Sequence, residues 1–163
     1  LMIIATNTMH LMADQVATAG AVPLIHIADA TGGALREAGV QRPLLLATHF
    51  TMAKAFYREQ VERVAGCRVV VPEEPHRSRV HEVIYEELVQ GQIREESRAA
   101  YLAIIDHYRR EQAIDAVIFG CTEVGLLLNQ SSIDQAGFDL PAFDTTAIHC
   151  RAAAAAILTS PGD

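Results

Sequence analysis

The chain alternates short apolar runs with longer stretches in which apolar residues recur at helical spacing. The short runs are typical of buried strands, and they predict strands at residues 1–5, 22–27, 43–47, 68–71, 116–120 and 140–143. The stretches between them predict helices at residues 9–19, 30–38, 51–65, 78–89, 95–112, 121–128 and 145–158. Because alternating strands and helices are typical of βαβ units, we expect an α/β fold with mainly parallel sheets flanked by helices.

Local signals refine several of these elements. Thr51 is expected to cap the helix at 51–65, and Gly66 is expected to end it. A polar loop is expected to follow the helix at 121–128 and to run to about Gly137. The five consecutive alanines at 152–156 give the last helix a thin face, which we expect to pack closely on a sheet.

Composition narrows the classes of partner. The 163 residues suggest one domain, or two small lobes that share a core. The chain has 13 basic and 20 acidic residues and a net charge of −7, which argues against binding to nucleic acid or to an anionic membrane surface. The apolar runs are too short to span a bilayer. The three cysteines form no CxxC pair, so we expect free thiols and a cytoplasmic location.

The sequence offers little for a metal or an organic cofactor. The seven histidines show no metal-ligand spacing, so no metal is expected. Neither a GxGxxG nor a Walker loop is present, which argues against a dinucleotide or a nucleoside triphosphate. A pyridoxal enzyme needs a Schiff-base lysine, and the single lysine, Lys54, is expected to be a solvated surface charge. We therefore expect any chemistry to run without a cofactor.

Two predicted strand ends carry similar polar sequences. Thr6, Asn7 and Thr8 follow the first strand, and Cys121 and Thr122 follow the strand at 116–120. Ligands of parallel α/β sheets bind beyond such strand ends, where helices begin. At a helix N-terminus the Cys121 thiol is expected to have a lowered pKa. The alternatives are a small buried core residue for Cys121 and an ordinary N-cap cluster for the first strand end.

The other two cysteines, Cys67 and Cys150, are expected to be packing residues. Neither follows the end of a predicted strand, since one precedes a strand and the other lies in the alanine-rich last helix.

Four segments resemble the aspartate/glutamate racemases, most closely their branch of broad amino-acid specificity: TNTMH at 6–10, HIADAT at 26–31, FGCTE at 119–123 and FDT at 143–145. The resemblance implies two pseudo-symmetric α/β lobes, a cleft between them and a reaction without cofactor. It also implies that residues 1–37 are the remainder of a first lobe, residues 38–135 a second lobe, and residues 136–163 a strand and helix that return to the first.

The resemblance also assigns roles in a two-base reaction on a small amino acid. Thr6 and Cys121 would face the α-carbon from opposite sides, one removing and the other returning a proton. Three residues, Asn7, Thr8 and Thr122, are implied to hold the substrate's α-carboxylate. Thr48 and Thr51 form a Thr-x-x-Thr loop that is implied to lie near the substrate. Arg79 is implied to be a cation near the distal end of the substrate.

Three departures from the family pattern change these expectations. Thr6 stands where a cysteine is usual. Because a hydroxyl is a poor base at neutral pH, we expect lopsided catalysis, in which one enantiomer is turned over faster than the other. Cys121 would then remove the proton from one enantiomer, which the resemblance implies is the L form. Ala47 replaces a glycine before Thr48. The family's opening strand and glycine-rich loop are absent, so we expect an incomplete first lobe.

Other readings stay open at this point. A related enzyme with a single cysteine, such as an arylmalonate decarboxylase, shares the lobe plan, as do hydantoin racemases and maleate isomerases. A catalytically silent amino-acid-binding module is a third reading, because Thr6 removes one base while leaving carboxylate recognition. A homodimer is expected by analogy with the fold.

Overall fold

The computed structural model describes residues 1–159, and it has the predicted α/β architecture with parallel sheets flanked by helices. The last four residues of the predicted segment 136–163 lie outside the described residues. A three-stranded parallel sheet has the order β3 (Pro43–Leu46), β4 (Ala116–Phe119) and β5 (Ala142–Asp144). A second, two-stranded parallel sheet joins β1 (Met2–Ile3) to β2 (Leu24–Ile25). The fold class predicted from the hydrophobic pattern is therefore confirmed.

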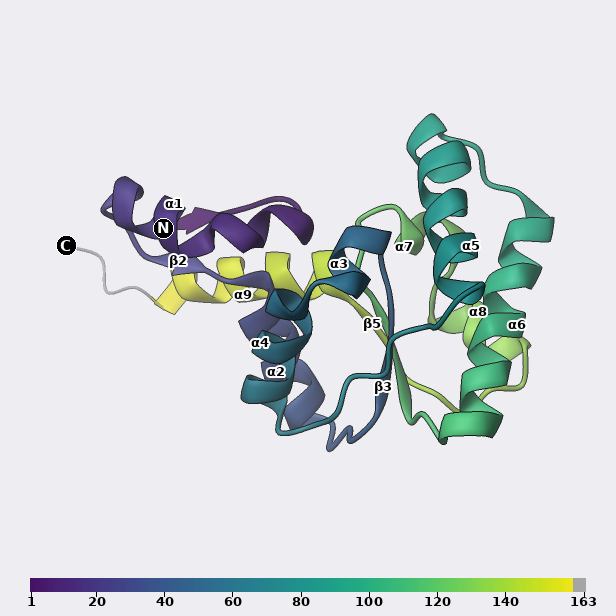
Figure 1. The fold of residues 1–163 in the computed structure, drawn as a ribbon. Helices are drawn as coiled ribbons and strands as arrows, with labels where there is room; N and C mark the ends of the chain where they lie inside the picture. Colours follow the sequence, from purple (N-terminus) through teal and green to yellow (C-terminus); the bar gives the residue numbers. More distant parts are fainter. Residues whose placement is uncertain (160–163) are drawn as a thin grey trace.

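Helices lie on both sides of the larger sheet (Figure 1). Every residue of β3 and β4 is buried, as expected for parallel strands covered on both faces. One side carries α2 (Ile27–Glu37) and α4 (Ala55–Ala65). The other side carries α5 (His76–Glu82), α6 (Glu95–Gln112) and α8 (Gln130–Gln135).

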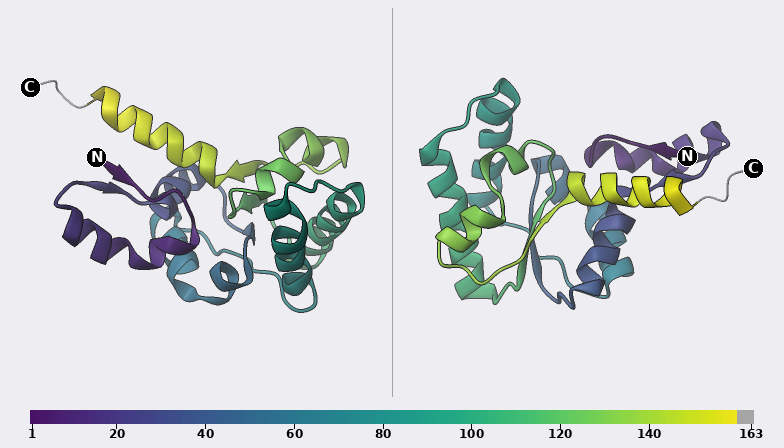
Figure 2. Two further views of the ribbon diagram at one scale, coloured as in Figure 1. Left: turned by 90° about the horizontal axis from the view of Figure 1, so that it is seen from above. Right: turned by 180° about the vertical axis from the view of Figure 1, so that it is seen from behind.

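The last helix and the first segment pack together although they are far apart in sequence. The segment after β1 forms the 3-10 helix η1 (Thr8–Met12) and α1 (Ala13–Gly20). Helix α9 (Thr145–Thr159) follows β5 and packs on α2 and β2, as the views in Figure 2 show. Its His149 Nε2 donates a hydrogen bond to the carbonyl of Ile25 over 2.8 Å. Strand β5 itself pairs with β4, and the division of the chain into lobes stays a prediction.

Helices α2 and α4 make a close contact at Gly32. A Cβ atom on this residue would lie 2.7 Å from Cβ of Val64. The next residue, Gly33, has open space where its Cβ would be. The absence of a side chain at Gly32 therefore lets the two helices approach each other on this side of the sheet.

The predicted helix at 51–65 is two helices, α3 (His49–Ala53) and α4, with Lys54 in extended backbone between them. The prediction of Thr51 as the cap is wrong, because Thr48 is the N-cap and its Oγ1 accepts a hydrogen bond from the Thr51 amide over 3.4 Å. Gly66 ends α4 with a φ of 70°, as predicted.

Other boundaries also differ from the pattern. The predicted helix at 78–89 is α5 followed by a π-helix, η2 (Val83–Glu87), and a 3-10 turn, η3 (Leu88–Gln90). The predicted helix at 121–128 shrinks to α7 (Val124–Leu127). The expected loop after it contains α8, capped by reciprocal bonds between Asn129 and Ser132. The predicted strand at 68–71 makes one bridge, Val70 to Leu44.

The alanines of α9, which packs on α2 and β2, are only partly covered: Ala152, Ala153 and Ala156 are half-buried. Ile148 and His149, in the first half of α9, are buried, whereas Ala154 and Ala155 are exposed. The second half extends past α2 toward the end of the molecule that carries the N-terminus (Figure 2). Cys150 is exposed, so its expected packing role is wrong.

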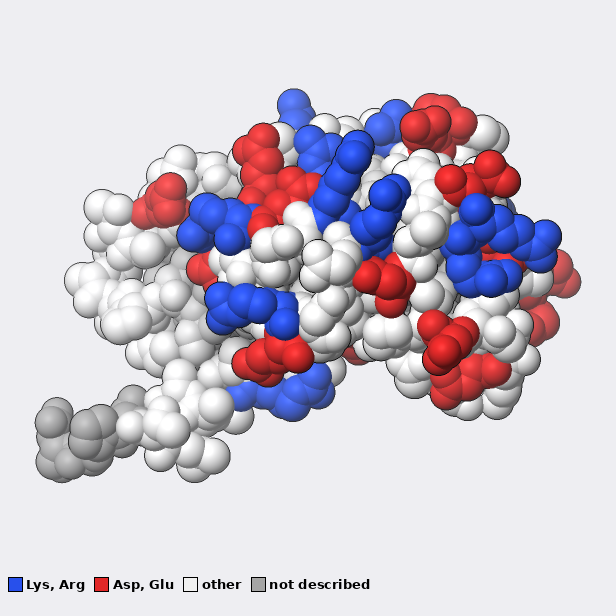
Figure 3. Space-filling model, turned by 90° about the horizontal axis from the view of Figure 1, so that it is seen from below, with Lys and Arg blue, Asp and Glu red and all other residues white. Residues whose placement is uncertain are grey.

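Charged and apolar residues are distributed unevenly over the surface. On the face drawn in Figure 3, basic and acidic side chains are interspersed, whereas the end that carries α1 and α9 is mostly uncharged. Large apolar side chains are exposed at this end: Leu1, Ile3, Leu11, Met12, Val22, Ile157 and Leu158. Among residues 1–159, none of the helices has the length and apolarity needed to cross a membrane.

Candidate functional site

The two polar strand ends meet at one cavity of about 470 Å³. It lies where β1, β3 and β4 end, which is the edge at which parallel sheets bind ligands. Six of the eight predicted site residues line it: Thr6, Asn7, Thr8, Thr48, Cys121 and Thr122. The remaining lining comprises Ala5, Met9, Ile84, Tyr85, Val89, Gly120 and Glu123.

His10 fixes the backbone of the first strand end. Its Nδ1 donates to the carbonyl of Thr6 over 2.7 Å, and its Nε2 accepts from the amide of Ile27 over 3.1 Å. Both bonds require a neutral ring with its proton on Nδ1. Burial lowers the pKa of His10 to about 4, reinforced by the facing rings of His26 and His149. The imidazole is therefore neutral at physiological pH and holds Thr6 against the start of α2.

Asn7 ties the two strand ends together. Its Nδ2 donates to Thr145 Oγ1 over 3.1 Å, and that hydroxyl donates to the carbonyl of Phe119, the last residue of β4, over 2.8 Å. Asn7 stands at the N-cap position of η1, but its side chain makes no capping bond there. Asn7 is buried, and its Oδ1 has no hydrogen-bond partner among the described residues.

Three hydroxyl groups form a cluster beside the cavity. Thr8 Oγ1 lies 2.9 Å from Thr51 Oγ1 and 3.5 Å from Thr48 Oγ1. Thr48 and Thr51 are themselves 3.1 Å apart through their hydroxyls. Thr51 is fully buried and does not line the cavity, so it acts on the site by orienting the hydroxyl of Thr8.

The Cys121 thiol is a hydrogen-bond donor in this structure. Its Sγ donates to Glu123 Oε2 over 3.0 Å, and the Thr122 hydroxyl donates to the same oxygen over 2.6 Å. Burial, together with the hydrogen bond to the Glu123 carboxylate, raises the pKa of Cys121 to about 12. Burial also acts to raise the pKa of Glu123, but the bonds from Cys121 and Thr122 outweigh it and lower that pKa.

The expectation of a lowered thiol pKa is therefore wrong. It assumed that Cys121 opens a helix, whereas α7 begins at Val124 and contains four residues. A helix this short has a weak dipole, and the effect fades beyond the first turn. The half-buried thiol is nonetheless not a plain packing residue, because it lines the cavity.

Gly120 permits the backbone path that brings Cys121 to the cavity. Its amide donates to the carbonyl of Leu46 over 2.8 Å, which extends the pairing of β4 with β3. A Cβ atom here would lie 2.6 Å from Cδ1 of Leu45 and 3.1 Å from Cβ of Ala47. A residue without a side chain is therefore needed immediately before the thiol.

Arg79 lies outside the cavity lining. Its guanidinium is 3.9 Å from a carboxylate oxygen of Glu87 and 3.7 Å from one of Glu82. It also donates to Ser97 Oγ over 3.5 Å. The structure therefore does not bring Arg79 together with the other predicted site residues.

Sequence reasoning missed the apolar wall of the cavity. Ile84 and Tyr85 come from η2 and Val89 from η3, and their spacing is that of an ordinary buried helix face. Yet Tyr85 is 52% exposed and Val89 is 55% exposed. No local signal marks the π-helix, although π-helical turns are frequent at functional sites.

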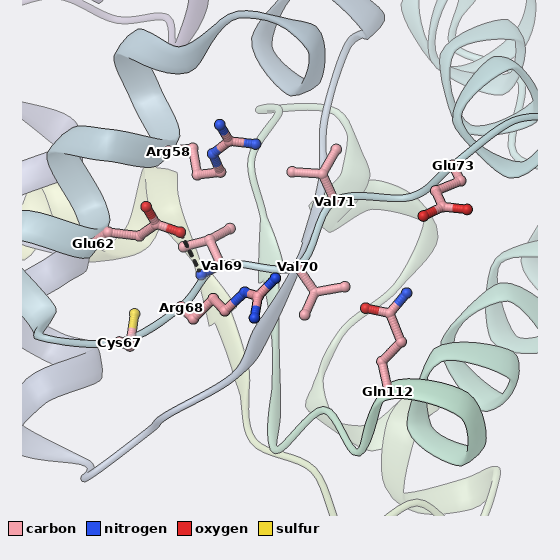
Figure 4. A pocket seen from close by; sticks show the side chains of 9 residues that line it. All are labelled: Arg58, Glu62, Cys67, Arg68, Val69, Val70, Val71, Glu73 and Gln112. Carbon is pink, nitrogen blue, oxygen red and sulfur yellow. Dashed lines mark hydrogen bonds between the residues drawn. The ribbon is translucent and has the colours of Figure 1, made fainter.

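A larger hollow of about 550 Å³ lies along the outer edge of the sheet (Figure 4). It shares no residue with the cavity at Cys121. Glu62 Oε1 accepts from the amide of Val69 over 2.9 Å, which satisfies one group of this sheet edge. Burial raises the pKa of Cys67 to about 11, so its thiol stays protonated. This hollow lies at an edge of the sheet, and its lining does not bring a base and a nucleophile together as the cavity at Cys121 does.

The comparisons with known proteins agree with the fold. Residues 1–153 match the family model of Asp/Glu/Hydantoin racemases, so the chain belongs to that family. The crystal structure of a Yersinia pestis protein assigned to the Asp/Glu racemases is 41% identical, with a TM-score of 0.86 over 96% of this chain and 66% of that one.

Two further solved structures extend the comparison. An aspartate racemase homologue from Pyrococcus horikoshii is 32% identical, with a TM-score of 0.83 over 94% of this chain and 65% of its own. A glutamate racemase from Francisella tularensis, in complex with D-glutamate, is 21% identical, with a TM-score of 0.71 over 96% of this chain and 56% of its own, and shows the shared fold. The chain thus spans 66%, 65% and 56% of the length of these three structures.

Proposed function

We propose that the chain carries the catalytic cavity of an amino-acid racemase that moves the α-proton of its substrate without a cofactor. One observation carries the proposal. Thr6 and Cys121, which come from the ends of strands in two different sheets, line one cavity together with hydroxyl and amide groups suited to a carboxylate. Membership of the Asp/Glu/Hydantoin racemase family supports the same conclusion.

The polar groups of the cavity suit the two ends of an amino acid's backbone. The hydroxyls of Thr8, Thr48 and Thr122 would donate to the α-carboxylate. The Glu123 carboxylate would pair with the α-ammonium group, because it is the acidic side chain in the lining. Asn7 would hold the loop through its bond to Thr145.

Substrate binding would also activate the thiol. In the empty cavity Glu123 accepts the proton of Cys121, which raises the thiol pKa. An ammonium group that engages Glu123 would weaken this bond and place a positive charge near the sulfur. Both effects favour the thiolate. The thiol proton would leave to solvent water. The resulting thiolate would take the α-proton and become the thiol again, and the electron pair of the broken C–H bond would stay on the substrate as its enolate.

Proton return from the opposite face would involve Thr6. Its hydroxyl is a weak acid, so we propose that it relays a proton from water rather than holding a charge itself. Thr6 is half-buried, which gives water access to its side. This asymmetry supports faster turnover of one enantiomer, and by the family resemblance Cys121 would remove the proton of the L form.

A protonated thiol opposite a threonine also suits a second reaction. A decarboxylase needs one acid to protonate the carbanion that remains after carbon dioxide leaves, and Cys121 with its raised pKa would be that acid. The family match favours the racemase. A homodimer and a cytoplasmic location stay predictions for either reaction.

The direct test is exchange of the α-proton in D₂O, followed by NMR with L- and D-amino acids and no added cofactor. Cys121→Ser should abolish exchange, whereas Cys150→Ser is the matched control because that thiol is exposed on α9. Exchange that survives Cys121→Ser would overturn the assignment of the base. Release of carbon dioxide from an arylmalonate without exchange on amino acids would favour the decarboxylase.

A further inference from the structure

The hollow drawn in Figure 4 lies beside the outermost segment of the larger sheet, residues 68–71, which we call the edge segment. The amide of Val70 donates to the carbonyl of Pro43 over 2.8 Å, which pairs the edge segment with β3. Alternate residues of a parallel strand direct their backbone groups to opposite sides. Val69 and Val71 therefore direct theirs away from β3, toward the hollow that both residues line.

One of these two outward amides is occupied and the other is free. The Val69 amide donates to Glu62 Oε1, whereas the Val71 amide has no hydrogen-bond partner within residues 1–159. Because Glu62 occupies a donor that a further strand would need, the edge is not suited to pairing with another strand. The volume of about 550 Å³ is instead typical of a site for a small molecule.

Two arginines without a partner face the same hollow. Six arginines of the described chain pair with a carboxylate. Within residues 1–159, the guanidinium groups of Arg58 and Arg68 make neither an ion pair nor a hydrogen bond. Arg58 is half-buried on α4, and Arg68 is exposed on the edge segment (Figure 4). A partly buried cation without a partner is unfavourable, and an anion that joined it would relieve this cost.

The charge around the hollow does not favour anions in general. The chain has a net charge of −7, so diffuse attraction would repel an anion rather than collect it. Glu62 and Glu73 also line the hollow. Glu62 is engaged by the Val69 amide, whereas the carboxylate of Glu73 opposes an incoming anion. Any anion bound here must therefore be held by short-range hydrogen bonds from particular donors.

We infer that this hollow is a second ligand site, separate from the cavity at Cys121, in which Arg58, Arg68 and the Val71 amide bind the phosphate or carboxylate group of a small molecule. Each guanidinium offers a planar pair of N–H donors that matches two oxygens of such a group. A free backbone amide is a further donor of the kind found in anion sites. The inference does not depend on the proposed function, because the two sites share no residue.

The test is an NMR titration of the full ¹⁵N-labelled chain with inorganic phosphate and, separately, with succinate, at constant ionic strength set by sodium chloride. The amide signal of Val71 should shift and saturate, with half-saturation at about 1 mM or below, which two or three charge-assisted hydrogen bonds support. Tighter binding of phosphate would assign a phosphate group to the natural ligand. Tighter binding of succinate would assign a carboxylate.

Three variants and a control test the donors. Arg58→Gln and Arg68→Gln should each weaken binding at least about tenfold. Arg63→Gln is the matched control, because it removes the same charge from α4 at a residue that pairs with Asp29 outside the hollow. Glu73→Gln should strengthen binding about threefold by removing the opposing charge. A gain of this kind is a result that a damaged fold would not give.

Three results would overturn the inference. The first is the absence of a saturable shift at Val71 with either anion. The second is equal weakening in Arg58→Gln and Arg63→Gln, which would show diffuse charge rather than a site. The third is a set of shifts confined to the amides of Gly120 and Thr122, which would place the anion in the cavity at Cys121.

Discussion

The stability of the fold should fall as His10 becomes protonated. The ring is 3% exposed, and its Nε2 accepts the Ile27 amide bond that a protonated ring would lose. Burial lowers its pKa from 6.5 to about 4, with contributions from His26 and His149. Because the folded state resists protonation more than the unfolded state, this contribution is complete above pH 6.5 and is lost as the pH falls toward 4.

The magnitude follows from the difference between the two pKa values. With about 1.4 kcal/mol per pKa unit, the linkage relation predicts that about 2 kcal/mol of unfolding free energy is lost by pH 5 and about 3 kcal/mol by pH 4. Other titrating groups add their own slopes, so the measured quantity is the difference from a variant that lacks the ring. His10→Gln serves as that variant, because an amide retains a donor and an acceptor without titrating in this range.

Urea unfolding at pH 7.5, 6, 5 and 4 gives the assay. The unfolding free energy of the unmodified chain should fall more steeply between pH 6.5 and 4 than that of His10→Gln. His107→Gln is the matched control, since His107 is exposed on α6 and far from the cluster in sequence. Parallel slopes for the unmodified chain and His10→Gln, or an NMR titration that places the pKa of His10 near 6.5, would refute the reasoning.

Three further predictions concern the backbone and the thiol. Gly120→Ala should destabilise the fold by about 1–3 kcal/mol in urea unfolding, because its Cβ would lie 2.6 Å from a β3 side chain; unchanged stability would contradict the close contact. Gly32→Ala should also destabilise the fold, because its Cβ would lie 2.7 Å from Val64, whereas Gly33→Ala should stabilise the fold by up to about 1 kcal/mol. If Gly32→Ala were the more stable of the two variants, α2 would not pack tightly on α4. At low substrate concentration, kcat/KM for α-proton exchange should rise about tenfold per pH unit from pH 6 to 9, because it reports the free enzyme, in which the Cys121 pKa of about 12 leaves little thiolate; a flat kcat/KM would contradict the raised pKa.

Local patterns predicted the parts of the fold that local physics determines. Helix α6 has the predicted bounds because its apolar spacing runs unbroken over residues 95–112. Strands β3 and β4 were found because buried parallel strands are continuous apolar runs. The π-helix η2 was missed, since its sequence keeps ordinary helical spacing and its widened turn depends on neighbouring elements.

In the candidate site too, the features set by local sequence were predicted, and those set by distant contacts were missed. The polar strand ends were visible in sequence, and the resemblance named six of the residues that line the cavity. The thiol pKa could not be predicted, because it depends on burial and on a bond to Glu123 that a longer α7 would have changed. The position of Arg79 depends on Glu87 and Ser97, and the latter is 18 residues away along the chain.

One chain of hydrogen bonds explains how two separate sheets can serve one reaction. Asn7 follows β1 in the smaller sheet, and Thr145 follows β5 in the larger sheet. The bonds from Asn7 to Thr145 and from Thr145 to the carbonyl of Phe119 fix the end of β1 against the end of β4. Thr6 and Cys121 adjoin the two ends of this hydrogen-bonded chain, so a change in it would alter the spacing of the two groups that would face one α-carbon in the proposed reaction. A proton transfer from opposite faces depends on that spacing more than on the affinity for substrate. The buried polar link therefore joins the fold to the proposed chemistry, which explains why polar side chains occupy a place that apolar packing could otherwise fill.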